Sequence, residues 1–317
     1  MTVFDVFNGD ADGICALHQL RLNEPTESEL ITGVKRNIKL LDGLSAKSGD
    51  QVNVMDISLD KNRDGLLLLL EQGANIIYFD HHFAGDIPEH ANLETHINTA
   101  ADTCSSLLVN DYLGGKHLPW AVTAAFGDNL FDSAVTAAKP LNLSHTQLEQ
   151  LKALGTYINY NGYGASLDDL HFTPSDLYKA IRPFQDPFEF IQNSAEYTTL
   201  EQGYLQDIES AKVINAELEN DTFAIYILPD ASWARRVSGV FANQLAQENR
   251  GRAHAIISEK SDGAYLVSVR APLNNKEGAD DVCRQFPTGG GRKAAAGINN
   301  LPKDEFNRLI AVMGEVF

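Results

Sequence analysis

The sequence of 317 residues has few cysteines and no long apolar run. Its three cysteines are Cys15, Cys104 and Cys283. Because they are odd in number and far apart, they indicate neither a disulfide framework nor a thiolate zinc site. The apolar runs at residues 66–70 and 121–126 are far too short to span a lipid bilayer. These absences exclude a disulfide-stapled secreted domain and a membrane-spanning protein.

A signal peptide is not expected either, since acidic residues at positions 5, 10 and 12 interrupt the stretch where its apolar segment would lie. We therefore expect a cytoplasmic protein with no membrane partner. With 44% hydrophobic residues the chain can bury a sizeable core. Its length exceeds that of one typical domain and predicts at least two.

Basic residues are also scarce. Lysine and arginine number 25 against 43 acidic residues, which gives a formal net charge of −18. That charge argues against binding of long nucleic acid, which needs a basic surface. Residues 230–297 alone carry ten basic and seven acidic side chains, so this segment is +3 and the remainder is −21. An acidic N-terminal part followed by this basic segment favours a small anionic ligand bound by a few arginines.

The first part of the chain alternates strand-like and helix-like segments, which predicts an α/β fold with a parallel sheet and helices on both faces. A helical middle follows, and the turn-rich residues 159–164 within it are expected to be structural. A polar, helix-compatible stretch then leads to a second, smaller α/β domain, where strand-like segments resume. The predicted divisions are a catalytic domain at 1–187, a helical connector at 188–218 and a substrate-binding domain at 219–317.

The segment around Asn8, Asp10, Asp12 and Gly13 lies between the first predicted strand and the first predicted helix. Two aspartates at the carboxyl end of a strand would project toward the crevice where open α/β sheets bind ligands. They repel each other unless a cation lies between them. Taken alone, the same pattern also suits a solvated turn.

Three further polar features lie at the ends of predicted elements, and each alone could be a cap or a turn. They are Asp56, the triplet Asp80-His81-His82, and Asp128. Together, carboxylates and histidines at the ends of neighbouring parallel strands converge on one crevice. Four carboxylates and a neutral imidazole suit two Mn²⁺-like ions, whereas a tetrahedral zinc site would favour sulfur and nitrogen.

These four features, in this order, resemble the motifs of the DHH phosphoesterases, in particular nanoRNase-like and pGpG-hydrolase-like members. The run Gly289-Gly290-Gly291-Arg292 is similar to the glycine-rich signature of the DHH-associated C-terminal domain, and the strand ending at Arg270 is similar to its arginine-bearing strand. The resemblance covers residues 3–135 and 223–300.

The resemblance implies a role for each matching residue. Asp10 would bind the first metal ion and Asp12 the second, while Asp56 would bridge them. His81 and Asp128 would complete the second site. Asn8 is the last residue assigned to metal binding. One branch of the family has an aspartate at this position, and an amide is a poorer ligand, so we expect the first site to bind its metal ion more weakly.

The catalytic set implied by the resemblance is Asp56, His81 and His82. His82 would contact a substrate phosphate, and Asp80 would orient a histidine. A hydroxide held between the two ions would attack phosphorus. The second domain would close over the crevice and bind phosphate through Arg270, Arg292 and the glycines at 289–291; a flexible loop is the alternative for those glycines. Cys104, Ser105 and Ser106 start a predicted helix whose N–H groups either face phosphate or are simply capped.

The resulting hypothesis is a Mn²⁺-dependent phosphodiesterase, with Mg²⁺ or Co²⁺ also possible, acting as a monomer or homodimer. It would cleave linear dinucleotides such as pGpG, or very short oligoribonucleotides, to mononucleotides. The alternatives are a RecJ-like single-strand exonuclease, a cyclic-dinucleotide phosphodiesterase and a non-catalytic nucleotide-binding regulator. A phosphotransferase has no P-loop to support it.

Overall fold

The fold comes from a computed structural model that describes residues 1–260 and 262–317. The chain forms two compact units, Met1–Gln202 and Gly203–Phe317, each with its own sheet. Helix α9 (Ala195–Lys212) passes from the first unit into the second and lies within the predicted connector. Among the described helices, none combines the length and the apolar character that crossing a membrane requires.

The sheet of the N-terminal unit has five parallel strands in the order β2-β1-β3-β4-β5. Strands β1, β3 and β4 are neighbours, so their carboxyl ends meet at the same edge. Val6, Val54 and Tyr78 on these strands are fully buried, as expected when helices cover both faces. The strands are β1 Val3–Phe7, β2 Glu29–Ile31, β3 Gln51–Met55, β4 Asn75–Asp80 and β5 Leu93–Ile97.

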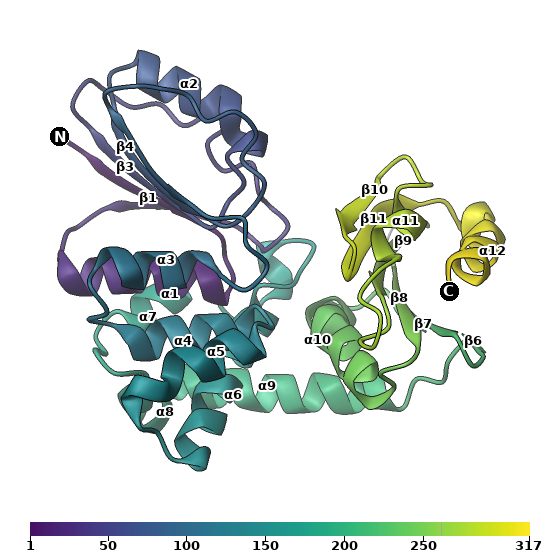
Figure 1. Cartoon of the computed structure of the whole chain (residues 1–317). Coiled ribbons are helices and arrows are strands. Elements are labelled where there is room, and N and C mark those ends of the chain that lie inside the picture. Colours follow the sequence, from purple (N-terminus) through teal and green to yellow (C-terminus); the bar gives the residue numbers. More distant parts are fainter. Residues whose placement is uncertain (261) are drawn as a thin grey trace. The chain divides into compact units, whose positions relative to one another are not determined.

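Helix α2 (Arg63–Glu71) covers one face of this sheet, while α1 (Ala11–Asn23) and α3 (Ser105–Tyr112) cover the other (Figure 1). Leu66 and Leu69 of α2 are fully buried in a cluster with the apolar side chains of β1, β3 and β4. A further layer of helices packs beneath α1 (Figure 1). Those helices are α4 Leu118–Gly127, α5 Phe131–Ala138, α6 His145–Asn161, α7 Pro174–Ile181 and α8 Pro187–Asn193.

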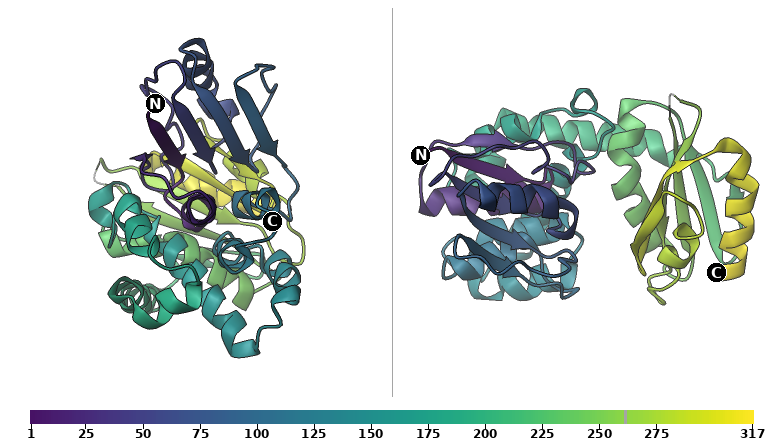
Figure 2. Two further views of the ribbon diagram at one scale, coloured as in Figure 1. Left: turned by 90° about the vertical axis from the view of Figure 1, so that its left-hand side faces the viewer. Right: turned by 90° about the horizontal axis from the view of Figure 1, so that it is seen from above.

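The C-terminal unit contains a mixed sheet in the order β10-β11-β9-β8-β7-β6, in which only β7 and β8 run parallel among the described strands. Helix α10 (Ser232–Glu248) lies on one side of it and α12 (Phe306–Val316) on the other (Figure 2, right). The strands are β6 Leu218–Glu219, β7 Phe223–Leu228, β8 Ala253–Glu259, β9 Tyr265–Arg270, β10 Gly289–Arg292 and β11 Ala295–Leu301.

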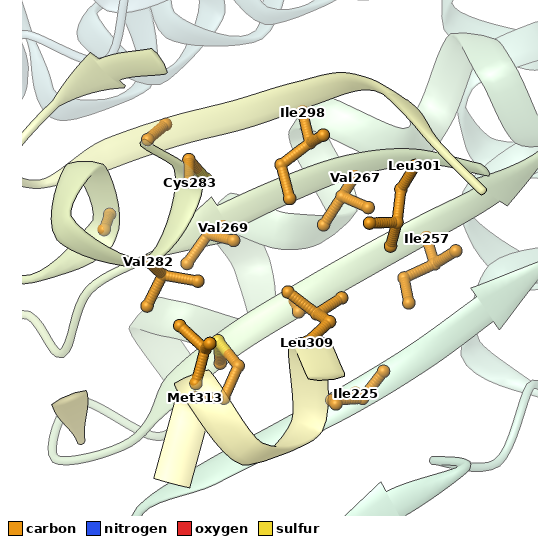
Figure 3. Close-up of a cluster of buried hydrophobic side chains, with 14 of the residues drawn as sticks. Ile225, Ile257, Val267, Val269, Val282, Cys283, Ile298, Leu301, Leu309 and Met313 are labelled. Atoms are coloured by element: carbon orange, nitrogen blue, oxygen red, sulfur yellow. The ribbon is translucent and has the colours of Figure 1, made fainter. Parts of the chain in front are cut away.

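The core of this unit lies between the sheet and the helices α11 (Ala279–Cys283) and α12 (Figure 3). Leu309 and Met313 of α12 are fully buried against strand residues such as Val267. The predicted α/β class, with a parallel-sheet domain followed by a smaller α/β domain, is confirmed. Strand β5 and the pairing of β10 with β11 are not among the predicted features.

Candidate metal centre

Four side chains that the sequence pattern singled out lie together at the carboxyl edge of the parallel sheet. His81 Nε2 lies 3.4 Å from a carboxylate oxygen of Asp56, 3.7 Å from Asp128 and 4.0 Å from Asp12. Asp56 follows β3, His81 follows β4, Asp12 is in the first turn of α1, and Asp128 follows α4. Because adjacent parallel strands end at the same edge, residues far apart in sequence meet here.

The hydrogen bonding of His81 fixes which of its ring nitrogens carries the proton. Its Nδ1 lies 3.0 Å from the carbonyl oxygen of Thr103, which can only accept a hydrogen bond. Nδ1 therefore donates, and in the neutral ring the lone pair of Nε2 is directed to the side of the three carboxylates. A histidine that donates from one nitrogen and presents the other is typical of a metal ligand.

The start of helix α3 holds the carboxylate of Asp12 in place. Its two oxygens accept hydrogen bonds from the backbone N–H groups of Ser105 and Ser106, each at 2.7 Å. The Ser105 hydroxyl also donates to Asp56 Oδ1, at 3.1 Å. The N–H groups at this helix start thus bind a protein carboxylate, and the interpretation in which they face a substrate phosphate is not supported. Sequence reasoning missed this orienting role of Ser105 and Ser106.

Asp56 combines an unusual backbone with an electrostatically unfavourable position. Its φ of +61° lies in the left-handed region, which non-glycine residues rarely adopt and which clusters at functional sites. Burial raises the pKa of the Asp56 carboxyl well above its usual range, and the charges of Asp12, Asp10 and Asp128 add to that effect. Burial likewise raises the pKa of Asp128. A cation among these carboxylates would relieve the repulsion.

The second histidine of the triplet is held differently. His82 Nδ1 lies 2.7 Å from Asp80 Oδ1, and its side chain is 41% exposed whereas that of His81 is 4% exposed. Asp80 itself is fully buried at the end of β4. His82 Nδ1 also lies 3.9 Å from Asp56 Oδ1. The structure therefore places a buried imidazole within the carboxylate cluster and a partly exposed imidazole, oriented by Asp80, at its margin.

Asp10 lies beside this cluster but is already engaged. Its Oδ1 caps helix α1 by accepting the N–H groups of Asp12 and Gly13, at 3.0 and 3.1 Å. A Cβ atom on Gly13 would lie 2.2 Å from the carbonyl oxygen of Asn8, so the tight turn requires glycine. Asp10 Oδ2 forms an ion pair with Lys35 Nζ at 2.5 Å. Burial opposes ionisation, but Lys35 lowers the pKa of Asp10 overall.

Lys35 is a site residue that sequence reasoning missed. Its Nζ also lies 2.8 Å from Asn159 Oδ1 and 3.8 Å from Asp128 Oδ1. Its position just beyond a predicted strand is a weak signal for such a role. Asn159, which the sequence places in a structural turn, lies in the last turn of α6. Asn8 follows β1 as expected, and its buried Oδ1 has no hydrogen-bond partner within the described residues.

The residues predicted to bind substrate in the second domain belong to two strands of the C-terminal sheet. Gly289, Gly290 and Gly291 form the edge strand β10 rather than a flexible loop. Arg292 ends β10 and is exposed. Arg270 ends β9, and its Nε donates to Asn243 Oδ1 at 2.7 Å.

Two of the three glycines are explained by packing. A Cβ atom at Gly289 would lie 1.7 Å from the carbonyl oxygen of Cys283, and Gly291 has a φ of +142°. At Gly290 a Cβ atom would meet no described atom within 4 Å. The fold therefore requires glycine at 289 and 291 but not at 290.

Comparison with known proteins assigns the C-terminal unit first. Residues 219–317 match the DHHA1 domain. This match confirms the resemblance for the C-terminal unit, and the solved structures below are similar in fold over nearly the whole chain. By sequence alone, none of the curated proteins matches the chain.

Among solved structures, exonuclease RecJ bound to manganese is similar over 98% of this chain and 89% of its own, with a TM-score of 0.63 and 14% identity. RecJ of Thermus thermophilus in complex with Mn²⁺ gives 0.63 and 16%, over 99% of this chain and about half (51%) of RecJ. The pGpG-specific phosphodiesterase PggH of Vibrio cholerae gives 0.56 and 11%, over 100% and 99%.

Proposed function

We propose that the protein is a divalent-metal-dependent phosphodiesterase that hydrolyses linear dinucleotides or very short oligoribonucleotides, with Mn²⁺ as the preferred ion. The observation that carries this proposal is the cluster of Asp12, Asp56, His81 and Asp128, with the His81 Nε2 lone pair among the three carboxylates. Oxygen-rich donors with one imidazole suit Mn²⁺ or Mg²⁺. The manganese bound to both RecJ structures is consistent with that choice.

A cation held by these four residues would polarise a phosphoryl oxygen and make water a stronger acid. The protein's own groups would position the metal ligands and bind the substrate. Ser105 and Ser106 hold Asp56 and Asp12 in position, and His82, oriented by Asp80, is accessible to contact a substrate phosphate. In the second domain, Arg270, Arg292 and the backbone of Gly290 would bind phosphate.

Three observations favour a short substrate. The formal charge of −18 disfavours long strands, and the few arginines of residues 230–297 suit a small anion. Similarity to PggH supports a linear dinucleotide such as pGpG. Similarity to RecJ supports the second candidate, a single-strand exonuclease, and a cyclic-dinucleotide phosphodiesterase or a nucleotide-binding regulator is a further alternative.

The test is hydrolysis of a substrate panel with Mn²⁺, with Mg²⁺ and with chelator. The panel contains pGpG, GpG, cyclic di-GMP, a tetranucleotide and a long single strand, and the products are separated by chromatography. We expect fastest cleavage of pGpG and none with chelator. Equal rates on long strands would favour the exonuclease, and binding of pGpG without cleavage would favour the regulator.

A second experiment with the same substrates tests whether Arg292 recognises the terminal phosphate. The resemblance implies a histidine where Arg292 stands, and arginine adds a permanent charge and a bidentate donor. We expect the wild-type protein to prefer pGpG over GpG, and Arg292→His to reduce that preference. An unchanged ratio would show that Arg292 does not read the terminal phosphate.

A further inference from the structure

Besides its ion pairs with Asp10 and Asp128, the Lys35 ammonium is positioned by contacts that involve no carboxylate. Its backbone N–H donates to the carbonyl oxygen of Gly162 at 2.8 Å, and its Nζ contacts Asn159 Oδ1 at 2.8 Å. Nζ also lies 5.4 Å from the centre of the Tyr163 ring, at a distance typical of a cation–π contact. The fold therefore positions this ammonium from the side of α6 and the turn that follows it.

Lys35 forms its shortest ion pair with Asp10, a residue that the resemblance assigns to the first metal ion. Asp10 Oδ1 accepts two backbone N–H groups, and Asp10 Oδ2 is 2.5 Å from Lys35 Nζ. Asn8 offers a neutral amide oxygen where a charged ligand would be expected. A divalent ion bound to Asp10 would have to displace the ammonium or lie close to it, and like charges repel strongly at such distances.

Lys35 has a looser contact with the residues assigned to the second ion, because its Nζ lies 3.8 Å from Asp128 Oδ1 and 2.5 Å from Asp10 Oδ2. Asp12, Asp56 and Asp128 surround His81 Nε2 within 4.0 Å, so three carboxylates and one imidazole are available to a single ion. The donors of the second set fit a divalent ion, whereas those of the first set already hold a cation that belongs to the chain.

We propose that the Lys35 ammonium replaces the first of the two cations, so that the protein holds one divalent ion on Asp12, Asp56, His81 and Asp128. This inference rests on the proposed function for its relevance to catalysis, and it differs from the two ions that the family resemblance implies. A neutral Asn8 and a cationic Lys35 together replace a charged ligand and its metal ion. The permanent cation stabilises negative charge without exchanging with solvent.

The test counts bound metal and does not depend on activity. The full-length protein is saturated with Mn²⁺, passed through a desalting column, and analysed for manganese per chain and by electron paramagnetic resonance. We expect one ion per chain and the six-line spectrum of an isolated Mn²⁺. The double variant Asn8→Asp/Lys35→Met frees Asp10 and restores a charged ligand, so it should bind two ions and show a spin-coupled spectrum.

Lys179→Met, which removes an exposed lysine of α7, is the matched control and should still bind one ion. Two ions, or none, on the wild-type protein would overturn the inference, and so would a folded double variant that binds one. If the double variant does not fold, judged by circular dichroism, the wild-type count alone decides. Two ions together with pGpG hydrolysis would refute this inference and leave the proposed function standing; one ion without any hydrolysis would do the reverse.

Discussion

The two units of this chain carry their polar groups in contrasting ways. In the N-terminal unit Asp12, Asp56 and His81 are buried. The start of α3 orients the two carboxylates, and the Thr103 carbonyl oxygen orients the imidazole. In the C-terminal unit the glycine strand β10 lies at the edge of its sheet, and Arg292 is exposed. Fixed, desolvated groups suit chemistry at one atom, while an accessible strand edge suits binding of a ligand's outer groups.

The cost of the two arrangements also differs. The cluster brings three carboxylates together next to Asp10, and Asp56 has a left-handed backbone. We therefore expect the metal-free N-terminal unit to be destabilised by its own site. The glycine strand of the C-terminal unit pairs regularly with β11 and stores no comparable repulsion. Substitutions at the site of the first unit should therefore lower activity and raise the stability of the metal-free protein, whereas those in the second unit should not raise its stability.

The largest effect is expected from Asp56→Asn. Asparagine tolerates the left-handed backbone, and the change removes one of the mutually repelling charges. We expect hydrolysis to fall about 10³-fold, because several kcal/mol of electrostatic stabilisation are lost. The metal-free variant should unfold at a higher temperature than the metal-free wild type.

A hydrolysis assay with Mn²⁺ checks the first half of this prediction, and scanning calorimetry of the metal-free proteins checks the second. Asp132→Asn, an exposed aspartate of α5, serves as the control and should change neither activity nor melting temperature appreciably. A lower melting temperature for metal-free Asp56→Asn would show that the cluster does not destabilise the N-terminal unit.

In the C-terminal unit we expect a smaller effect, from Gly290→Ala. A Cβ atom there enters open space, so the melting temperature should not change. If a substrate phosphate approaches the backbone at this position, the added methyl group should raise KM about tenfold with kcat nearly constant, because a charge-assisted hydrogen bond is worth about 1.5–3 kcal/mol. Gly289→Ala should instead unfold the hairpin, because its Cβ atom would overlap the Cys283 carbonyl group. Unchanged KM in a folded Gly290→Ala protein would remove this glycine from the binding site.

Most of the fold and the centre of the site could be predicted from the sequence, for a physical reason. Alternating strand and helix patterns fix the parallel sheet, and the rule that ligands bind at carboxyl ends places Asp12, Asp56 and His81 together. Lys35 could not be found in this way, because it reaches the cluster from a loop and no periodic pattern marks it. Its partner Asn159 lies at the end of a helix 124 residues away, and only the tertiary fold brings the two together.

A smaller effect, back in the N-terminal unit, is expected from Phe83→Ala. This phenylalanine directly follows His82 and is 73% exposed, which is unusual for a large apolar side chain. Stacking of a base on an aromatic ring contributes about 1–3 kcal/mol, so KM for a dinucleotide should rise about fivefold or more. Leu68→Ala, an exposed leucine of α2, should leave KM unchanged. Equal effects of the two substitutions would argue against a base platform at Phe83.

Substitution of two buried histidines, one in each unit, is expected to have no effect on activity at neutral pH. Burial lowers the pKa of His18 to about 4, and burial does the same for His254. Each is neutral when folded and gains a proton more readily when unfolded, near the ordinary pKa of about 6.5. The stability that each contributes is therefore present above that pH and is lost as the pH falls toward 4, by about 3 kcal/mol for His18.

Denaturant melts between pH 7 and pH 4 test the two units separately. His18→Gln keeps a donor for the Phe184 carbonyl oxygen, which lies 2.8 Å from His18 Nε2, and should flatten the pH dependence of the N-terminal unit alone. His254→Gln should act on the C-terminal unit alone, and the exposed His145→Gln on neither. If both buried substitutions altered a single transition equally, the two units would unfold together, and the contrast drawn between them would hold for their chemistry but not for their stability.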